Sequence, residues 1–121
     1  MAPSKCNALS TFLSSFTYFK WSENGKKKKN GAYEIITALN SFHGRTMMNV
    51  SATGQPHYQE LFEPIPTGFT HVPYNDLDEI KKATNDNTVA VMIEPVQGEG
   101  GVNVPSEDYL KGVREWLDFL L

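Results

Sequence analysis

The stretch VAVMI, residues 89–93, is a continuous run of apolar residues. Such a run is typical of a strand that is covered on both faces, as the strands of a parallel β-sheet are. Two further strand candidates precede it, YEIITAL at residues 33–39 and FTHV at residues 69–72. The sequence therefore predicts three strands.

The segment between the second and third of these strands has the features of a short helix. Asn75 or Asp76 can cap its amino terminus, and acidic residues fill its first turn. Leu77, Ile80 and Thr84 then recur on one helical face. Because strands alternate with helices, the pattern predicts an α/β architecture with right-handed crossovers.

A longer amphipathic helix is predicted at the carboxyl end. Ser106 stands at its N-cap position, and Glu107 and Asp108 occupy the first turn. Hydrophobic residues follow at helical spacing: Tyr109, Leu110, Val113, Trp116, Leu117 and Leu120. The predicted fold class is thus a mostly parallel α/β sheet with flanking helices.

The length of the chain indicates a single domain, and its charge distribution divides it into two parts. Its 121 residues are about one small domain with a single hydrophobic core. Residues 1–30 carry six lysines and one acid, whereas residues 31–121 carry five basic and thirteen acidic side chains. We place a boundary near Asn30 and expect residues 1–30 to be a divergent amino-terminal segment, either disordered or non-homologous.

The amino-terminal segment bears on cellular location. It is rich in serine and has no acid before Glu23, as an organellar transit peptide would, but it lacks arginine. The sequence has no apolar run long enough for a membrane span, and its single cysteine, Cys6, excludes an internal disulfide framework. We expect a cytoplasmic protein, or a mitochondrial or plastid one if this segment is a transit peptide.

Polar and aromatic residues gather after the first and third predicted strands, in the segments SFHGRT and EPVQGEGGV. In open α/β sheets, ligands bind beyond the carboxyl ends of the strands, so we expect these segments to meet there. The first offers the ring of Phe42 and the fork-shaped cation of Arg45, which suits a carboxylate. The second offers Glu94, Gln97 and Glu99 on a loop that its glycines make flexible. Together they could hold an amino acid.

Other kinds of site are excluded by spacing and composition. His43, His57 and His71 lie fourteen residues apart, which is not a spacing of metal ligands. The GEGG loop lacks the Lys-Ser or Lys-Thr of a P-loop and does not fit the dinucleotide fingerprint. The lysines at 26–29 are typical of a solvated loop. We expect no metal, nucleic-acid or membrane partner.

Several phrases of the sequence, taken in order, resemble a known family. They are YEIITALNSFHGRT, SATGQPHYQELFEP, GFTHVPYNDL, TVAVMIEPVQGEGGVNVP and DYLKGVREW. They resemble the large domain of class III, pyridoxal-phosphate-dependent aminotransferases, most closely the acetylornithine group. The resemblance implies that residues 31–121 are part of the cofactor-binding domain of a fold-type I aminotransferase. It also implies amino-group transfer from an amino-acid substrate to 2-oxoglutarate, in arginine biosynthesis, by a homodimer.

The resemblance also implies roles for single residues. Phe42 would stack on the pyridine ring of the cofactor, with His43 and Glu94 as further cofactor-binding residues. Arg45 of the HGRT motif would bind the substrate α-carboxylate. Glu99 would line the substrate site and pair with a switching arginine found elsewhere in such enzymes.

Three parts of such an enzyme are not recognisable in this sequence. Where the family has the turn and EANE helix start that hold the cofactor phosphate, the chain reads FTYFKWSENGKKKKN. The chain stops at Leu121, before the aspartate that pairs with the ring nitrogen and before the Schiff-base lysine. A smaller departure is the MMN run at residues 47–49, which we expect to leave the local helix intact.

Three interpretations therefore stay open. The first, which we favour, is a partial acetylornithine or ornithine aminotransferase that is inactive as an isolated chain, so that no residue is assigned as catalytic. The second is a non-catalytic fragment or interaction module that associates with full-length aminotransferase subunits. The third is a gene-model artefact, which would explain the change of character near Asn30.

Overall fold

The computed structural model describes the backbone of residues 18–21 and 32–120 and the side chains of residues 32–119. Expectations that fall on other residues lie outside the described ones. These are the transit peptide, the single cysteine, the lysines at 26–29 and most of the segment that replaces the phosphate-binding turn.

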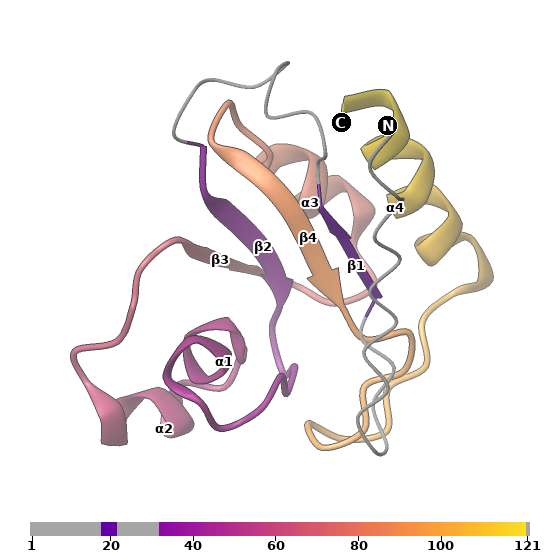
Figure 1. The fold of residues 1–121 in the computed structure, drawn as a ribbon. Coiled ribbons are helices and arrows are strands. Elements are labelled where there is room, and N and C mark those ends of the chain that lie inside the picture. The colour runs from indigo at the N-terminus through magenta and orange to yellow at the C-terminus, as the bar shows by residue number, and fades with distance from the viewer. Residues whose placement is uncertain (1–17, 22–31, 121) are drawn as a thin grey trace, which may run out of the picture.

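One four-stranded sheet has the strand order β1-β4-β2-β3 (Figure 1). The strands are β1 (Tyr18–Trp21), β2 (Glu34–Ala38), β3 (Phe69–Val72) and β4 (Thr88–Ile93). β2 runs parallel to both β3 and β4, which confirms the three predicted strands and the mostly parallel sheet.

The edge strand β1 was not predicted. It pairs antiparallel with β4, and Tyr18 lies opposite Ile93 in the register. It falls within residues 1–30, the segment that the composition sets apart as divergent. The boundary near Asn30 stays a prediction.

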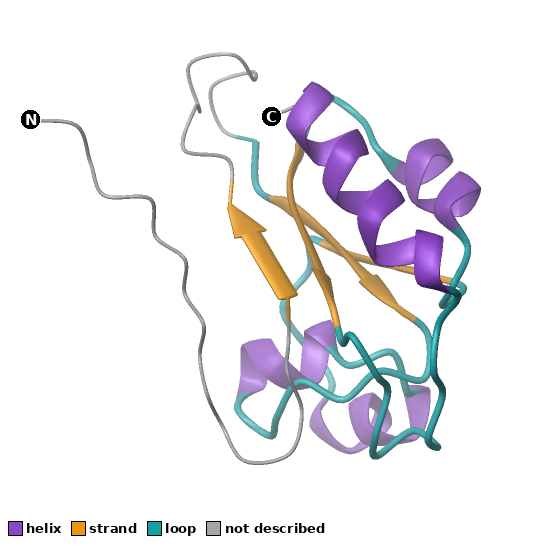
Figure 2. Ribbon diagram, turned by 90° about the vertical axis from the view of Figure 1, so that its right-hand side faces the viewer, coloured by secondary structure: helices purple, strands orange, loops and turns teal. Residues whose placement is uncertain are grey.

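Helices lie on one face of the sheet and at one of its ends. They are α1 (Met47–Ala52), α2 (Pro56–Gln59), the 3₁₀ turn η1 (Glu60–Phe62), α3 (Leu77–Ala83) and α4 (Glu107–Leu120). α3 and α4 cover one face together, whereas α1 and α2 lie beyond the strand ends (Figures 1 and 2). α1 contains the MMN run, so the expectation of a helix there is confirmed.

The hydrophobic core lies between the sheet and the α3–α4 pair. Its buried members are Ile36, Ala38, Val72, Ile80, Val91, Ile93, Tyr109, Val113 and Leu117. Burying a side chain of this size contributes about 1.5–3 kcal/mol, so these contacts dominate the stability of the unit. The predicted amphipathic face of α4 is confirmed for its described residues, because Tyr109, Val113 and Leu117 are all buried.

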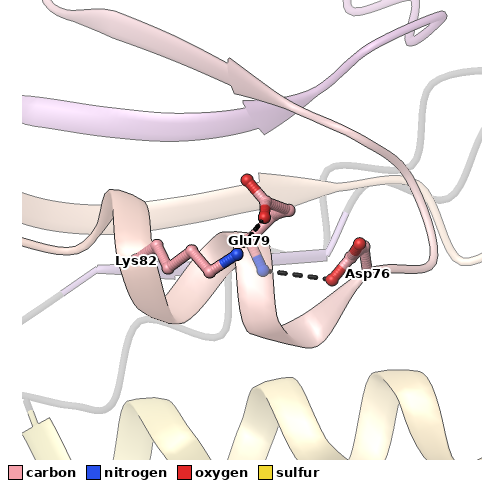
Figure 3. Close-up of polar contacts among 3 residues, drawn as sticks. All are labelled: Asp76, Glu79 and Lys82. Carbon is pink, nitrogen blue, oxygen red and sulfur yellow. Dashed lines mark hydrogen bonds and ion pairs between the residues drawn. The ribbon is translucent and has the colours of Figure 1, made fainter.

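The two covering helices are joined at their amino ends. Asp76 is the N-cap of α3, because its side chain accepts a 3.1 Å hydrogen bond from the Glu79 backbone N–H (Figure 3). The adjacent Asn75 has a left-handed backbone with φ of 63°. Its Oδ1 accepts hydrogen bonds of 3.0 Å from the backbone N–H and the hydroxyl of Ser106, the residue that precedes α4. Ser106 thus links α4 to α3.

The loop after β4 is held against the loop after β2. The side-chain amide of Gln97 donates a 2.8 Å hydrogen bond to the carbonyl oxygen of Leu39. At Gly100, a Cβ atom would lie 1.7 Å from the carbonyl oxygen of Asn40, so any larger residue would force the two loops apart. A glycine is therefore needed at position 100 because the two backbones lie in close contact. The sequence alone suggested flexibility as the role of the glycines in this loop.

Candidate functional site

Three segments meet beyond the carboxyl ends of β2 and β4. The first two, residues 40–46 and residues 94–103, were expected to meet there from the topology. The third, residues 53–59 around α2, joins them through hydrogen bonds to Ser41 and Glu99. The expected convergence is thus present, and it includes an additional wall.

Arg45 lies over two aromatic rings. Its guanidinium carbon is 6.0 Å from the ring centre of Phe42 and 5.6 Å from that of Tyr58. The two rings contact each other edge to face, with centres 5.8 Å apart. Within the described residues, Arg45 forms no ion pair, so its solvent-exposed guanidinium can receive an anion.

Glu99 is held by two neutral donors. The Tyr58 hydroxyl donates to one carboxylate oxygen at 2.5 Å, and the Gln55 side-chain amide donates to the other at 2.6 Å. These two hydrogen bonds lower the pKa of Glu99, with smaller contributions from the charges of His57 and Arg45. The carboxylate is therefore ionised at neutral pH. The same hydrogen bond raises the pKa of Tyr58, which keeps the phenol protonated as a donor.

Glu94 directly follows β4 and carries a fully buried carboxyl group. Among the residues that the structure describes, neither of its oxygens has a hydrogen-bond partner. Its pKa is raised to about 7, mainly by burial; the nearby backbone N–H of Phe42 offsets part of the rise, and the charge of Glu99 makes a smaller contribution to it. Buried polar atoms in native proteins almost always have a partner, so this carboxyl group fits a site that a ligand or another polypeptide segment completes.

His43 is the second group with unpaired polar atoms. Its backbone N–H donates to the hydroxyl of Thr53 at 3.0 Å, but both ring nitrogens are buried and have no partner in the described part of the chain. Burial, with a smaller contribution from the charge of the nearby His71, lowers the pKa of His43 to about 4. The imidazole is therefore neutral at physiological pH.

Gln97 has a structural position, not the ligand-facing one that the sequence suggested. It is buried, and its side-chain oxygen accepts a hydrogen bond from Asn103 while its amide bonds to Leu39. Gln55 and Tyr58, in contrast, were not assigned to the site. The phrase GQPHYQE carries no recognisable chemical motif, and Tyr58 reaches an acid 41 residues further along the chain. Gln55 and Tyr58 lie in a phrase that resembles the family, but nothing in their spacing predicts a contact with Glu99.

Within the part of the chain that the structure describes, no three His, Cys, Asp or Glu side chains are grouped so that they could hold a metal ion. None of its described helices is long and apolar enough to cross a membrane. The site thus consists of an aromatic pair, an open guanidinium, an anchored carboxylate and two buried groups that no described residue pairs. Such a set can bind a planar aromatic ligand together with a carboxylate.

Comparison with known proteins gives consistent matches. The sequence pattern of the family described as "Aminotransferase class-III" matches residues 14–118. An acetylornithine aminotransferase of Methanothermobacter thermautotrophicus is 56% identical over 89 residues, which is 74% of this chain and 23% of the relative. One from Methanocaldococcus jannaschii is 54% identical over 85 residues, 70% of this chain and 21% of the relative. The chain therefore spans about a quarter of the length of the curated relatives that it matches.

Solved structures give the same result at the level of the fold. The ornithine aminotransferase of Toxoplasma gondii superimposes with a TM-score of 0.73 at 33% identity, over 82% of this chain and 24% of that one. A second structure of that enzyme, crystallized in the presence of oxidized glutathione, matches with a TM-score of 0.71 at 34% identity, over 78% of this chain and 22% of that one. It is described as having partial occupancy of PLP at the active site.

Proposed function

This chain belongs to the class-III aminotransferase family, and on that premise we propose that it is part of a pyridoxal-phosphate-dependent aminotransferase of the acetylornithine or ornithine type. The observation that carries the proposal is the unpaired Arg45 over the ring of Phe42, beside the anchored Glu99. The proposal has further parts: the amino group goes to 2-oxoglutarate, the reaction belongs to arginine biosynthesis, and the enzyme is a homodimer. It works in the cytoplasm, or in the mitochondrion or plastid if the amino-terminal segment is a transit peptide. These parts rest on the family.

The described residues fit the cofactor. A flat aromatic ring needs an aromatic or apolar face, and the half-buried Phe42 provides one. Glu94 and His43 carry buried polar atoms that pair with no described residue, as expected of groups that complete their hydrogen bonds with a ligand. We propose that these three residues hold the cofactor. When bound, pyridoxal phosphate supplies an electron sink for the amino acid.

Lysine is the residue that the described part of the site does not provide. Between residues 32 and 119 the lysines are Lys81 and Lys82 on α3 and Lys111 on α4. Both helices cover the face of the sheet, away from the three site segments (Figures 1 and 2). This placement supports the proposal that the chain does not turn over alone and that its residues work within a larger enzyme.

Arg45 is the proposed anchor of the substrate α-carboxylate. A guanidinium binds a carboxylate through two parallel hydrogen bonds, which fixes the orientation of the amino acid as well as its position. The rings of Phe42 and Tyr58 beside Arg45 restrict the directions that the guanidinium can take. The proposed role of Glu99 is to line the same substrate site.

Replacement of Arg45 tests the proposal, in a full-length relative that carries the same HGRT segment. Arg45→Ala removes both the positive charge and the planar pair of N–H donors. We expect kcat/KM to fall by about ten- to a hundred-fold, since a hydrogen bond to a charged group is worth about 1.5–3 kcal/mol. Arg45→Lys is the matched control. It keeps the charge without the planar fork, so it should restore activity only in part.

Melting temperature and cofactor content are measured on the same preparations. Both should stay near their wild-type values, because the exposed Arg45 forms no ion pair with described residues. Unchanged kcat/KM in Arg45→Ala would remove the substrate-anchor role. Loss of cofactor and of thermal stability together with activity would assign Arg45 a structural role instead.

A non-catalytic module that associates with full-length subunits is the second candidate. The exposure of Val102 and Val104, at 81% and 72%, favours it, because apolar side chains this open are typical of a surface that another polypeptide covers. Under this alternative the chain would co-migrate with full-length subunits in size-exclusion chromatography. Under the first proposal, co-migration with full-length subunits is not required.

A further inference from the structure

Resting on the proposed function, we propose that Gln55 and Tyr58 are positioning residues that hold the carboxylate of Glu99 in place. Their hydrogen bonds keep this carboxylate from pairing with Arg45. The guanidinium is thereby left open for the α-carboxylate of an amino-acid substrate.

The geometry of the three side chains supports this role. Each oxygen of Glu99 accepts one short hydrogen bond, from the Tyr58 hydroxyl at 2.5 Å and from the Gln55 amide at 2.6 Å. Both donors come from one short segment, 41 and 44 residues before the acid. A carboxylate held at both oxygens has little freedom to turn toward another partner.

The two donors are themselves fixed. The Gln55 amide also donates to the carbonyl oxygen of Ser41 at 3.0 Å, next to the site aromatic Phe42. The Tyr58 backbone N–H donates to the carbonyl oxygen of Gln55 at 3.1 Å, within the single turn of α2. Gln59 continues this turn and donates to the carbonyl oxygen of Thr53 at 2.9 Å. The two donors, Gln55 and Tyr58, are therefore fixed to the backbone of the site; we call this pair the clamp.

The electrostatics explains why a clamp is needed. Arg45 and Glu99 carry opposite charges on long side chains in one exposed site, so a direct ion pair would be the natural result. The structure has neutral donors at the carboxylate instead, and they lower its pKa more than Arg45 does. Tyr58 contacts both charges, because its hydroxyl binds Glu99 while its ring lies under the guanidinium at 5.6 Å. Its phenol and ring thus keep the two charges apart.

Kinetics on a full-length relative with counterparts of these four residues test the inference. Tyr58→Phe keeps the ring under Arg45 and removes one donor, so only Gln55 still holds Glu99 and the carboxylate can turn toward the guanidinium. We expect KM for an amino-acid donor to rise about ten-fold, with kcat little changed. KM for an amine donor without an α-carboxylate should stay the same. Gln55→Met, which removes the second donor, should act in the same direction.

A double-mutant cycle separates positioning from simple packing. In a Glu99→Ala background the competing carboxylate is gone, so Tyr58→Phe should have no further effect on KM. Tyr33→Phe, which removes the hydroxyl of an exposed tyrosine that is 60% accessible, is the matched control and should change nothing.

The two proposals fail in different ways. If Arg45→Ala raises KM while Tyr58→Phe and Gln55→Met leave it unchanged, the positioning role is overturned and the substrate anchor stands. If the Tyr58→Phe effect persists without Glu99, the role is also overturned, since it then comes from packing. If Arg45→Ala has no effect, the proposed function itself is wrong.

Discussion

At the scale of single residues, the buried carboxyl group of Glu94 has a consequence for stability. Its pKa is about 7 in the folded chain, against 4.5 for a free side chain, because burial disfavours the charged form. The folded state therefore binds this proton more tightly than the unfolded state. The stabilisation is complete below pH 4.5 and is lost as the pH rises to about 7.

We expect Glu94→Gln to remove this part of the pH dependence. The shift corresponds to about 3 kcal/mol of unfolding free energy, a difference that urea unfolding between pH 4.5 and 8 can measure. Glu107→Gln, at an exposed acid on α4, is the control and should keep the wild-type slope. A Glu94→Gln profile that parallels the wild type would show that the carboxyl group is not held in its neutral form.

His43 acts on the same profile with the opposite sign. Its pKa falls from 6.5 to about 4 on folding, so its stabilisation is present above pH 6.5 and is lost as the pH falls toward 4. Glu94 stabilises the fold at low pH and His43 stabilises it at high pH, so the two effects overlap in the pH profile of the wild type. The quantity to compare is therefore the difference in unfolding free energy between the wild type and Glu94→Gln at each pH.

The residues of the candidate site were predictable to different degrees. Phe42, Arg45 and Glu99 lie in the loops that follow β2 and β4, so both their position and their chemistry indicated a binding site. Gln55 and Tyr58 were missed because their role is set by a contact across 41 or more residues. Such a contact leaves no local pattern in the sequence.

At the scale of elements, the cap of α3 can be tested directly. Asp76 satisfies the otherwise unpaired N–H of Glu79 at the start of a helix of only seven residues. We expect Asp76→Ala to lower the free energy of unfolding by about 1 kcal/mol. Asp78→Ala, which removes an exposed acid from the same turn, should lower it much less.

Denaturant unfolding of both variants at one pH gives the comparison. Equal losses for the two variants would indicate that charge near the helix terminus matters more than the cap. The ion pair between Lys82 and Glu79, 2.6 Å apart on the exposed face, is expected to contribute less than the cap because water screens it (Figure 3).

Elements with their own sequence signals were predicted well. β4 has a continuous apolar run, and α4 has both acids in its first turn and an apolar stripe. β1 is rich in aromatic residues that favour strands, but it is only four residues long, and its place at the edge of the sheet is set by pairing with β4. A short edge strand of this kind is a tertiary feature, which propensity alone does not reveal.

At the scale of the whole molecule, large apolar side chains remain exposed. Leu61, Val102, Val104 and Phe119 are each 72–81% accessible. The sheet also ends in two edges, β1 and β3, whose outer backbone groups no described strand pairs. Surfaces of this kind are typical of a unit that packs against further polypeptide.

We therefore expect the isolated chain to self-associate as its concentration rises. Sedimentation velocity over a range of concentrations measures this, and Val102→Ser with Val104→Ser should weaken the association if these residues contribute. A monomer at all concentrations, with a cooperative melt and well-dispersed amide resonances, would contradict this expectation. It would show that the chain is a stable domain without further polypeptide.

The strand order also bears on how the chain is made. β1 and β2 are close in sequence, yet β4 lies between them in the sheet. Synthesis proceeds at about 5–20 residues per second, so β4 leaves the ribosome several seconds after β2. Throughout that interval β1 has no partner strand in this sheet, and one edge of β2 is open to other nascent chains. When β4 enters the sheet it pairs with β1 and with the second side of β2, and it is followed by the loop at residues 94–103, so these parts of the site come together only after β4 has been made.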